Sequence, residues 1–90
     1  MSGAKRSGHP TVVLYGSPEC HLCDDARDVL EAVRRGIQFE LVERDITLDD
    51  DLHRRYLERI PVVEIDGEEA FELFVDPAEL RQRLGRVDRA

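Results

Sequence analysis

Hydrophobic and polar positions change their period along the chain, and these changes predict where strands and helices lie. Residues 11–15 (TVVLY) form a short apolar, β-branched run closed by Gly16-Ser17-Pro18, which predicts a buried strand and then a tight loop. The next apolar positions recur with the helical period: Leu22, Ala26, Val29, Leu30 and Val33. Gly36 predicts where this first helix ends.

A second strand and a second helix are predicted next. Residues 38–46 (QFELVERDI) have the composition of a strand, and Thr47 is placed to cap a short helix that runs to about Leu57. The expected apolar stripe of that helix is Leu48, Leu52 and Tyr56. The acidic run at residues 49–51 is interpreted as its solvated first turn.

The third and fourth strands are expected to form a hairpin. Pro61 suits the first position of a strand, because it lacks an N–H, and residues 62–65 (VVEI) follow it. Asp66-Gly67 is a strong two-residue hairpin signal. Residues 68–74 should therefore return as a strand antiparallel to the third.

The last helix has a well-marked start. Its signals are Asp76 as N-cap, Pro77 and Glu79 in the first turn, and Val75 with Leu80 as a hydrophobic staple. We expect it to end at Gly85, and we expect Phe71, Leu73 and Phe74 to pack against it. The order β-α-β-α-β-β-α predicts an α/β fold with a four-stranded mixed sheet flanked by helices.

Composition narrows the class of protein. Ninety residues with 41% hydrophobic and 37% charged positions fit one globular domain, here residues 11–85 between a flexible N-terminal tail (1–10) and a C-terminal tail (86–90). The net charge of −7 argues against nucleic acid as a partner. No apolar run is long enough to cross a membrane, and residues 1–10 lack the apolar core of a signal peptide. We therefore expect a cytoplasmic monomer.

Cys20-His21-Leu22-Cys23 stands where the first strand's loop becomes the first helix. A helix N-terminus stabilises a thiolate through its dipole and its unpaired N–H groups. Cys20 would be the exposed nucleophile, and Cys23 is near enough in sequence to resolve a mixed disulfide. A cysteine pair after a strand in a strand–helix–strand context is typical of redox proteins with a thioredoxin-like fold.

Other interpretations of these residues remain open at this stage. The cysteines could be inert thiols or a stabilising crosslink, and Pro61 could be a plain strand opener. His21 could raise the thiolate fraction or be an exposed polar residue. A structural zinc site takes four ligands, and Cys20, Cys23 and His21 cannot readily face one ion, so no metal is expected.

The stretches VVLYGSPECHLCDDA, ERDI and RIPVVEIDGEE resemble the glutaredoxin-like branch of the thioredoxin superfamily over roughly residues 11–84. The resemblance implies a thioredoxin-like fold in which Cys20 attacks and Cys23 resolves. It also implies that Pro61 follows a cis peptide bond and lines the substrate groove. His21, Leu22, Ile60 and Pro61 are then the expected substrate-binding residues. By family analogy, an iron–sulfur cluster bridged between two chains is an alternative use of the cysteines.

The departures from the family pattern concern the substrate. Glutaredoxins usually carry Cys-Pro-Tyr-Cys, a lysine shortly before it and a Gly-Gly segment before an Asp. Apart from the two cysteines, only the Asp of this pattern has a counterpart in this chain, which is Asp76. The closer resemblance is to short glutaredoxin-like proteins with Cys-x-Leu-Cys. We expect a thiol–disulfide oxidoreductase without a resident cofactor, with glutathione or another thiol as co-substrate. Its partners would be a disulfide-containing protein or small disulfide and a thiol reductant or reductase. The alternative is a non-catalytic interaction or redox-sensing module.

Overall fold

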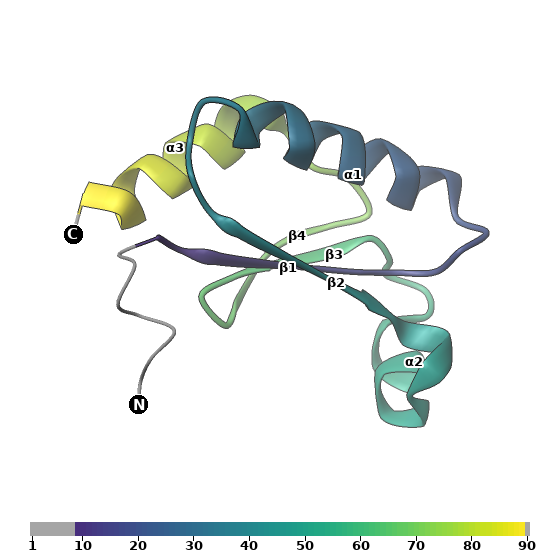
Figure 1. The fold of residues 1–90 in the computed structure, drawn as a ribbon. Coiled ribbons are helices and arrows are strands. Elements are labelled where there is room, and N and C mark those ends of the chain that lie inside the picture. The colour runs from purple at the N-terminus through teal and green to yellow at the C-terminus, as the bar shows by residue number, and fades with distance from the viewer. Residues whose placement is uncertain (1–8, 90) are drawn as a thin grey trace.

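The computed structural model describes residues 9–89 and contains one four-stranded mixed sheet with helices on both faces (Figure 1). The elements in chain order are β1 (Thr11–Gly16), α1 (His21–Arg34), β2 (Glu40–Asp45), η2 (Ile46–Leu48), α2 (Asp50–Tyr56), β3 (Val62–Ile65), β4 (Glu68–Glu72) and α3 (Pro77–Arg89). This confirms the predicted fold class. None of the described helices is long and apolar enough to span a membrane.

The strands lie in the order β2-β1-β3-β4. β1 runs parallel to β2 and antiparallel to β3, and β3 pairs antiparallel with β4. Helices α1 and α3 cover one face, and the short α2 covers one end of the other face (Figure 1). The parallel β1–α1–β2 crossover therefore brings the start of α1 to the carboxyl end of β1, where the cysteine pair lies.

The main core lies between the sheet and the α1/α3 layer. Its fully buried members include Val12 and Leu14 of β1, Leu30 of α1, and Leu80 and Leu84 of α3. A smaller cluster of Ile46, Tyr56 and Val62 lies on the α2 face. Strand β1 lies between these two cores. Its side chains on the α1 face are therefore buried, and the alternate side chains on the α2 face are partly buried.

The buried face of α1 differs from the expected stripe at its first residue. Leu22 is 50% exposed, and the buried positions are Cys23, Ala26, Leu30 and Val33, which keep the helical spacing. Val29 packs against the core from the side. The prediction was therefore wrong for Leu22, because Cys23 occupies the inward position of the first turn.

The start of α2 also differs from the prediction. Asp49, not Thr47, is the N-cap, and its carboxylate accepts hydrogen bonds from the N–H groups of Asp51 (2.9 Å) and Leu52 (3.1 Å). Thr47 lies in η2, which Asp45 caps by accepting from the Thr47 N–H at 2.9 Å. Leu48 is consequently outside the helix and 82% exposed, so it is not part of the apolar stripe. The carboxylate of Asp49 therefore caps α2, and the hydroxyl of Thr47, two residues earlier, does not.

The hairpin forms at the predicted turn. Asp66 and Gly67 have φ values of 51° and 89°, the left-handed pair that a two-residue hairpin requires. Asp66 also ties the turn to β1, since its carboxylate accepts from the Thr11 N–H at 2.9 Å. β4 is shorter than expected and stops at Glu72, so Leu73 and Phe74 lie outside the strand.

The two ends of the domain correct the predicted tails. α3 continues through Gly85 to Arg89, so the predicted end at Gly85 is wrong and residues 86–89 belong to the helix. The buried Leu80 and Leu84 hold this helix on the core and outweigh the cost of a glycine inside it. At the other end Pro10 is buried and its carbonyl accepts from the Glu40 N–H at 2.9 Å. The rest of the predicted N-terminal tail, residues 1–8, lies outside the described residues.

Candidate redox site

Cys20 is the N-cap of α1. Its backbone is extended (φ −108°, ψ 110°), its carbonyl accepts the first helical hydrogen bond from the Asp24 N–H at 3.1 Å, and its sulfur accepts from the Cys23 N–H at 3.1 Å. The cap position is usually filled by Ser, Thr, Asp or Asn, whose oxygen accepts this hydrogen bond. The positive end of a helix stabilises a thiolate in that place when the cysteine is reduced.

Cys20 and Cys23 form a disulfide with their Cα atoms 5.2 Å apart, and these are the chain's two cysteines. The two sulfur-bearing residues differ in exposure: Cys20 is partly exposed, whereas Cys23 is buried, with 1% of its surface accessible. An incoming group can therefore reach Cys20 far more readily than Cys23. Attack by Cys20 and resolution by Cys23 stay predictions from the sequence.

Gly16, at the end of β1, packs directly against the resolving cysteine. A Cβ on Gly16 would lie 2.9 Å from the Cys23 sulfur and 3.1 Å from its Cβ. In the sequence, Gly16 stands out only as part of a loop signal. The close approach of strand and helix at this point requires a residue without a side chain.

A cavity of about 300 Å³ lies beside Cys23, between the ends of β1 and β2 and the first turns of α1. Arg27 lines it and links α1 to β2, donating to Glu43 (2.9 Å) and to Asp24 (3.0 Å). These hydrogen bonds, first to Glu43 and then to Asp24, raise the pKa of Arg27, so its positive charge is permanent. Asp24, in the first turn of α1, is thereby paired with a cation, which weakens its repulsion of negative charge on the cysteines.

Pro61 lies at the same end of the sheet as the cysteines. Tyr15 pairs with Val62 across the β1–β3 ladder, so one step further along the register sets Pro61 beside Gly16. The Ile60–Pro61 peptide bond is cis, and Pro61 is buried. The Ile60 N–H donates to the Tyr56 carbonyl at 3.0 Å, so this N–H is already paired within the chain.

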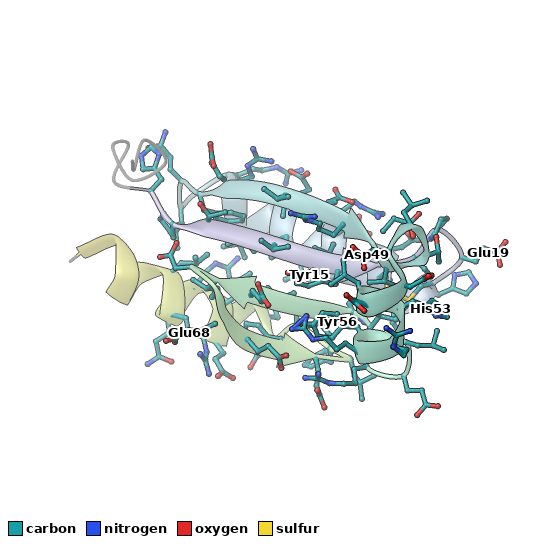
Figure 2. The ribbon with its side chains drawn as sticks, turned by 90° about the horizontal axis from the view of Figure 1, so that it is seen from below. Tyr15, Glu19, Asp49, His53, Tyr56 and Glu68 are labelled. Carbon is teal, nitrogen blue, oxygen red and sulfur yellow. A yellow bond between two sulfur atoms is a disulfide. The ribbon has the colours of Figure 1, made fainter. Side chains whose placement is uncertain are left out.

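The remaining predicted site residues lie on the surface. His21 and Leu22 are both exposed at the start of α1. Figure 2 shows Glu19, just before the pair, projecting outward from this end of the molecule. No group of three or more His, Cys, Asp or Glu side chains among the described residues is arranged to hold a metal ion.

Leu73 and Phe74 are neighbours of this site that sequence analysis missed. Both were expected to pack against the last helix, but they are 47% and 68% exposed and line a cavity with Leu22. Only Phe71 of the expected trio packs on the core. A signal was present in the sequence, because two adjacent residues in extended backbone point to opposite sides and cannot both face one helix.

Fold and cysteine placement together define a thioredoxin-fold protein with a Cys-x-x-Cys pair, which supports a redox-type role. Residues 11–85 match the family described as glutaredoxin-like domain (DUF836). The chain therefore belongs to the glutaredoxin-like domain family.

Solved structures show the same likeness. Protein Ne2328 from Nitrosomonas europaea has 28% identity and a TM-score of 0.74 over 84% of this chain and 92% of that one. The structural genomics target XcR50 from X. campestris has 32% identity and a TM-score of 0.69 over 83% of this chain and 96% of that one. A chloroplastic thioredoxin z shares 18% identity with a TM-score of 0.76 over 97% of this chain and 84% of that one, which is a likeness of fold.

Proposed function

We propose that the chain is a thiol–disulfide oxidoreductase in which Cys20 is the nucleophile and Cys23 the resolving thiol. The observation that carries this proposal is the position of Cys20, partly exposed at the N-cap of a 14-residue helix, with its sulfur accepting the Cys23 N–H. The same N–H can hold the sulfur when it is a thiolate, the form that attacks disulfides.

The proposed reaction moves two electrons from the protein to a disulfide RS–SR′. The Cys20 thiolate attacks one sulfur, a Cys20–SR bond forms, the S–S bond breaks, and R′S⁻ leaves and takes a proton from water. Cys23, after losing its proton to water, attacks the Cys20 sulfur and releases RS⁻. The protein finishes with the Cys20–Cys23 disulfide, and a thiol reductant must return it to the dithiol form by two further exchanges.

The burial of Cys23 supports its role as the resolving group. Buried among β1 and α1, it is 5.2 Å (Cα–Cα) from Cys20 and has access to little else. Attack on Cys20 is therefore its favoured reaction, because proximity converts a bimolecular step into an intramolecular one. The substrate is a disulfide-containing protein or a small disulfide, and glutathione or another thiol would act as the reductant.

One observation favours a second candidate, a non-catalytic redox-sensing module. With 1% of its surface accessible, Cys23 could react too slowly to sustain turnover. In that case the Cys20–Cys23 bond would report the redox state of the surroundings without turning over.

Two variants distinguish the candidates. The Cys20→Ser protein should lose reductase activity toward a test disulfide, and the Cys23→Ser protein should accumulate mixed disulfides through Cys20, detectable by mass analysis. Ala32→Ser, on the exposed face of α1, serves as a control for the added hydroxyl. If Cys20→Ser reduces the test disulfide as fast as the wild type, the nucleophile assignment is wrong.

A further inference from the structure

Three large apolar side chains lie exposed beside the cysteine pair. Leu22, between the two cysteines, is 50% exposed, and Leu73 and Phe74, which follow β4, are 47% and 68% exposed. Together with Asp25, Val29 and Val75 they line a cavity, here named the Leu22–Phe74 cleft. Apolar surface of this kind next to a reactive group indicates a contact site.

The wall formed by the β4–α3 segment is held in place by backbone interactions. The Leu73 N–H donates to the carbonyls of Pro61 (2.7 Å) and Arg59 (3.2 Å), and Leu73 has a positive φ of 69°. Val75, two residues on, is buried in the core, and Asp76 accepts from the Ala78 N–H at 3.1 Å at the start of α3. A preformed cleft binds its occupant without the entropic cost of ordering a loop.

The size of the cleft favours one side chain over a whole small molecule. Its volume is about 100 Å³, whereas small-molecule sites usually measure about 300–1,000 Å³. The lining is apolar apart from one group, Asp25, so the occupant should be an aliphatic or aromatic side chain.

The charge around the cleft determines which residue of the partner is favoured next to the bound apolar side chain. Asp25 is the charged residue among the lining side chains. Arg59, which precedes β3, is bonded to Glu69 and, at 2.7 Å, to Glu72. A partner with a lysine or arginine next to its apolar side chain gains an attraction to Asp25. A small disulfide that carries carboxylates is repelled both there and by the net charge of −7.

We infer that the Leu22–Phe74 cleft takes one apolar side chain of an extended polypeptide substrate, with a basic residue beside it facing Asp25, while the substrate's disulfide meets Cys20. The inference rests on the proposed function and specifies its substrate class: cationic, apolar protein segments rather than anionic small thiols. Backbone of Ile60 and Leu73 flanks such a segment on the β3–β4 side.

Single-turnover kinetics with activated peptides test the inference. Reduced protein is mixed with cysteine peptides carrying a neutral pyridyl disulfide, flanked by Leu and Lys in one and by Ser and Glu in the other, and pyridinethione release is followed. Neutral dithiodipyridine is the small reference disulfide. For the wild type, the Leu–Lys peptide should react about 5–30-fold faster than the Ser–Glu peptide, the factor expected for burying part of one side chain.

Matched variants locate the effect. In Phe74→Ser, the ratio of the Leu–Lys peptide rate to the dithiodipyridine rate should fall about 5–30-fold. In Leu48→Ser, which removes an exposed leucine in η2, the ratio should not change. Asp25→Asn should reduce the preference for the Leu–Lys peptide over the Ser–Glu peptide, and the reduction should be largest at low salt. Asp28→Asn, an exposed carboxylate on the same helix, should not.

The possible failures are separable. An equal rate for both peptides, or a Phe74→Ser ratio equal to that of the wild type, overturns the cleft assignment while Cys20 chemistry stands. A wild-type protein whose Cys20 does not react with dithiodipyridine contradicts the proposed function itself. Dimerisation at rising concentration that Phe74→Ser abolishes, seen by sedimentation, would assign the cleft to a second copy of the chain and overturn the inference.

Discussion

An alanine Cβ at position 16 would lie 2.9 Å from the sulfur of Cys23. Real Cβ atoms essentially never approach another atom this closely, so either the sulfur or the backbone would have to shift. In the oxidised protein the Cys23 sulfur is bonded to Cys20 and cannot rotate away. In the reduced protein the thiol is free to change rotamer. Gly16 therefore favours the disulfide form of the site.

Gly16→Ala should consequently destabilise the oxidised protein more than the reduced one. Overpacking of this kind costs about 1–3 kcal/mol. Because about 30 mV corresponds to 1.4 kcal/mol for a two-electron couple, the midpoint potential should rise by roughly 20–60 mV. Urea unfolding of both forms and a redox titration measure the two effects. An unchanged or lower potential would show that Gly16 does not set the position of Cys23.

Gly85 lies inside α3, and a Cβ there would meet nothing within 4 Å. Gly85→Ala should therefore raise the free energy of unfolding by about 0.5–1 kcal/mol, the difference in helix propensity. Gly67→Ala is the matched control, since Gly67 is equally open but has a φ of 89° and should lose stability. Stabilisation by both substitutions, or by neither, would contradict this account of the two glycines.

Tyr15 makes the stability of the fold depend on pH in the alkaline range. Its ring packs at a tilt against that of Tyr56 with centroids 4.8 Å apart, and its hydroxyl donates to Glu64 at 3.2 Å. Burial and then the Glu64 carboxylate raise the pKa of Tyr15 above its usual 10.0, and burial raises the pKa of Tyr56. The folded protein thus holds these phenol protons more tightly than the unfolded chain.

The stabilisation that comes from the raised tyrosine pKa values is complete below the unfolded-state pKa of about 10. It is lost as pH rises through the folded-state pKa. The free energy of unfolding, measured with urea, should therefore decline above about pH 10. Tyr15→Phe should make the decline shallower, while lowering stability at neutral pH by about 0.5–1.5 kcal/mol through loss of the hydrogen bond. A slope equal to that of the wild type would exclude Tyr15 as its source.

Asp49 is expected to carry the stability of α2. Its carboxylate satisfies the N–H groups of Asp51 and Leu52, and α2 in turn presents Tyr56 to the smaller core. Asp49→Ala should cost about 1 kcal/mol in unfolding free energy. Asp50→Ala, one residue further into the helix, should cost clearly less, and equal losses would argue against capping as the cause.

The sequence predicted those features in which several local signals agreed. Each of three predicted features has one backbone conformation that suits it, and all three formed: the Asp66-Gly67 turn, the Asp76-Pro77 helix start and the first strand. The cysteine pair was placed correctly because a strand, a loop and a helix stripe all converge on it.

The features that were missed depend on contacts between distant segments. Leu22 was assigned inward by its spacing, but the inward place in the first turn belongs to Cys23, packed on Gly16. The exposure of Phe74 follows from β4 ending at Glu72, and the extension of α3 from the packing of Leu84. Tertiary packing sets the position of Leu22 and the length of α3, and no local pattern in the sequence carries these two outcomes.

The midpoint potential of the Cys20–Cys23 pair tests the central claim most directly. It is measured by alkylation and mass analysis across a graded thiol redox buffer, with Cys20→Ser as the control that cannot form the bond. An exchange catalyst whose Cys20 thiolate is held by a helix N-terminus should titrate between about −180 and −270 mV. A potential below about −300 mV, typical of structural disulfides, would contradict the assignment of a redox-active site.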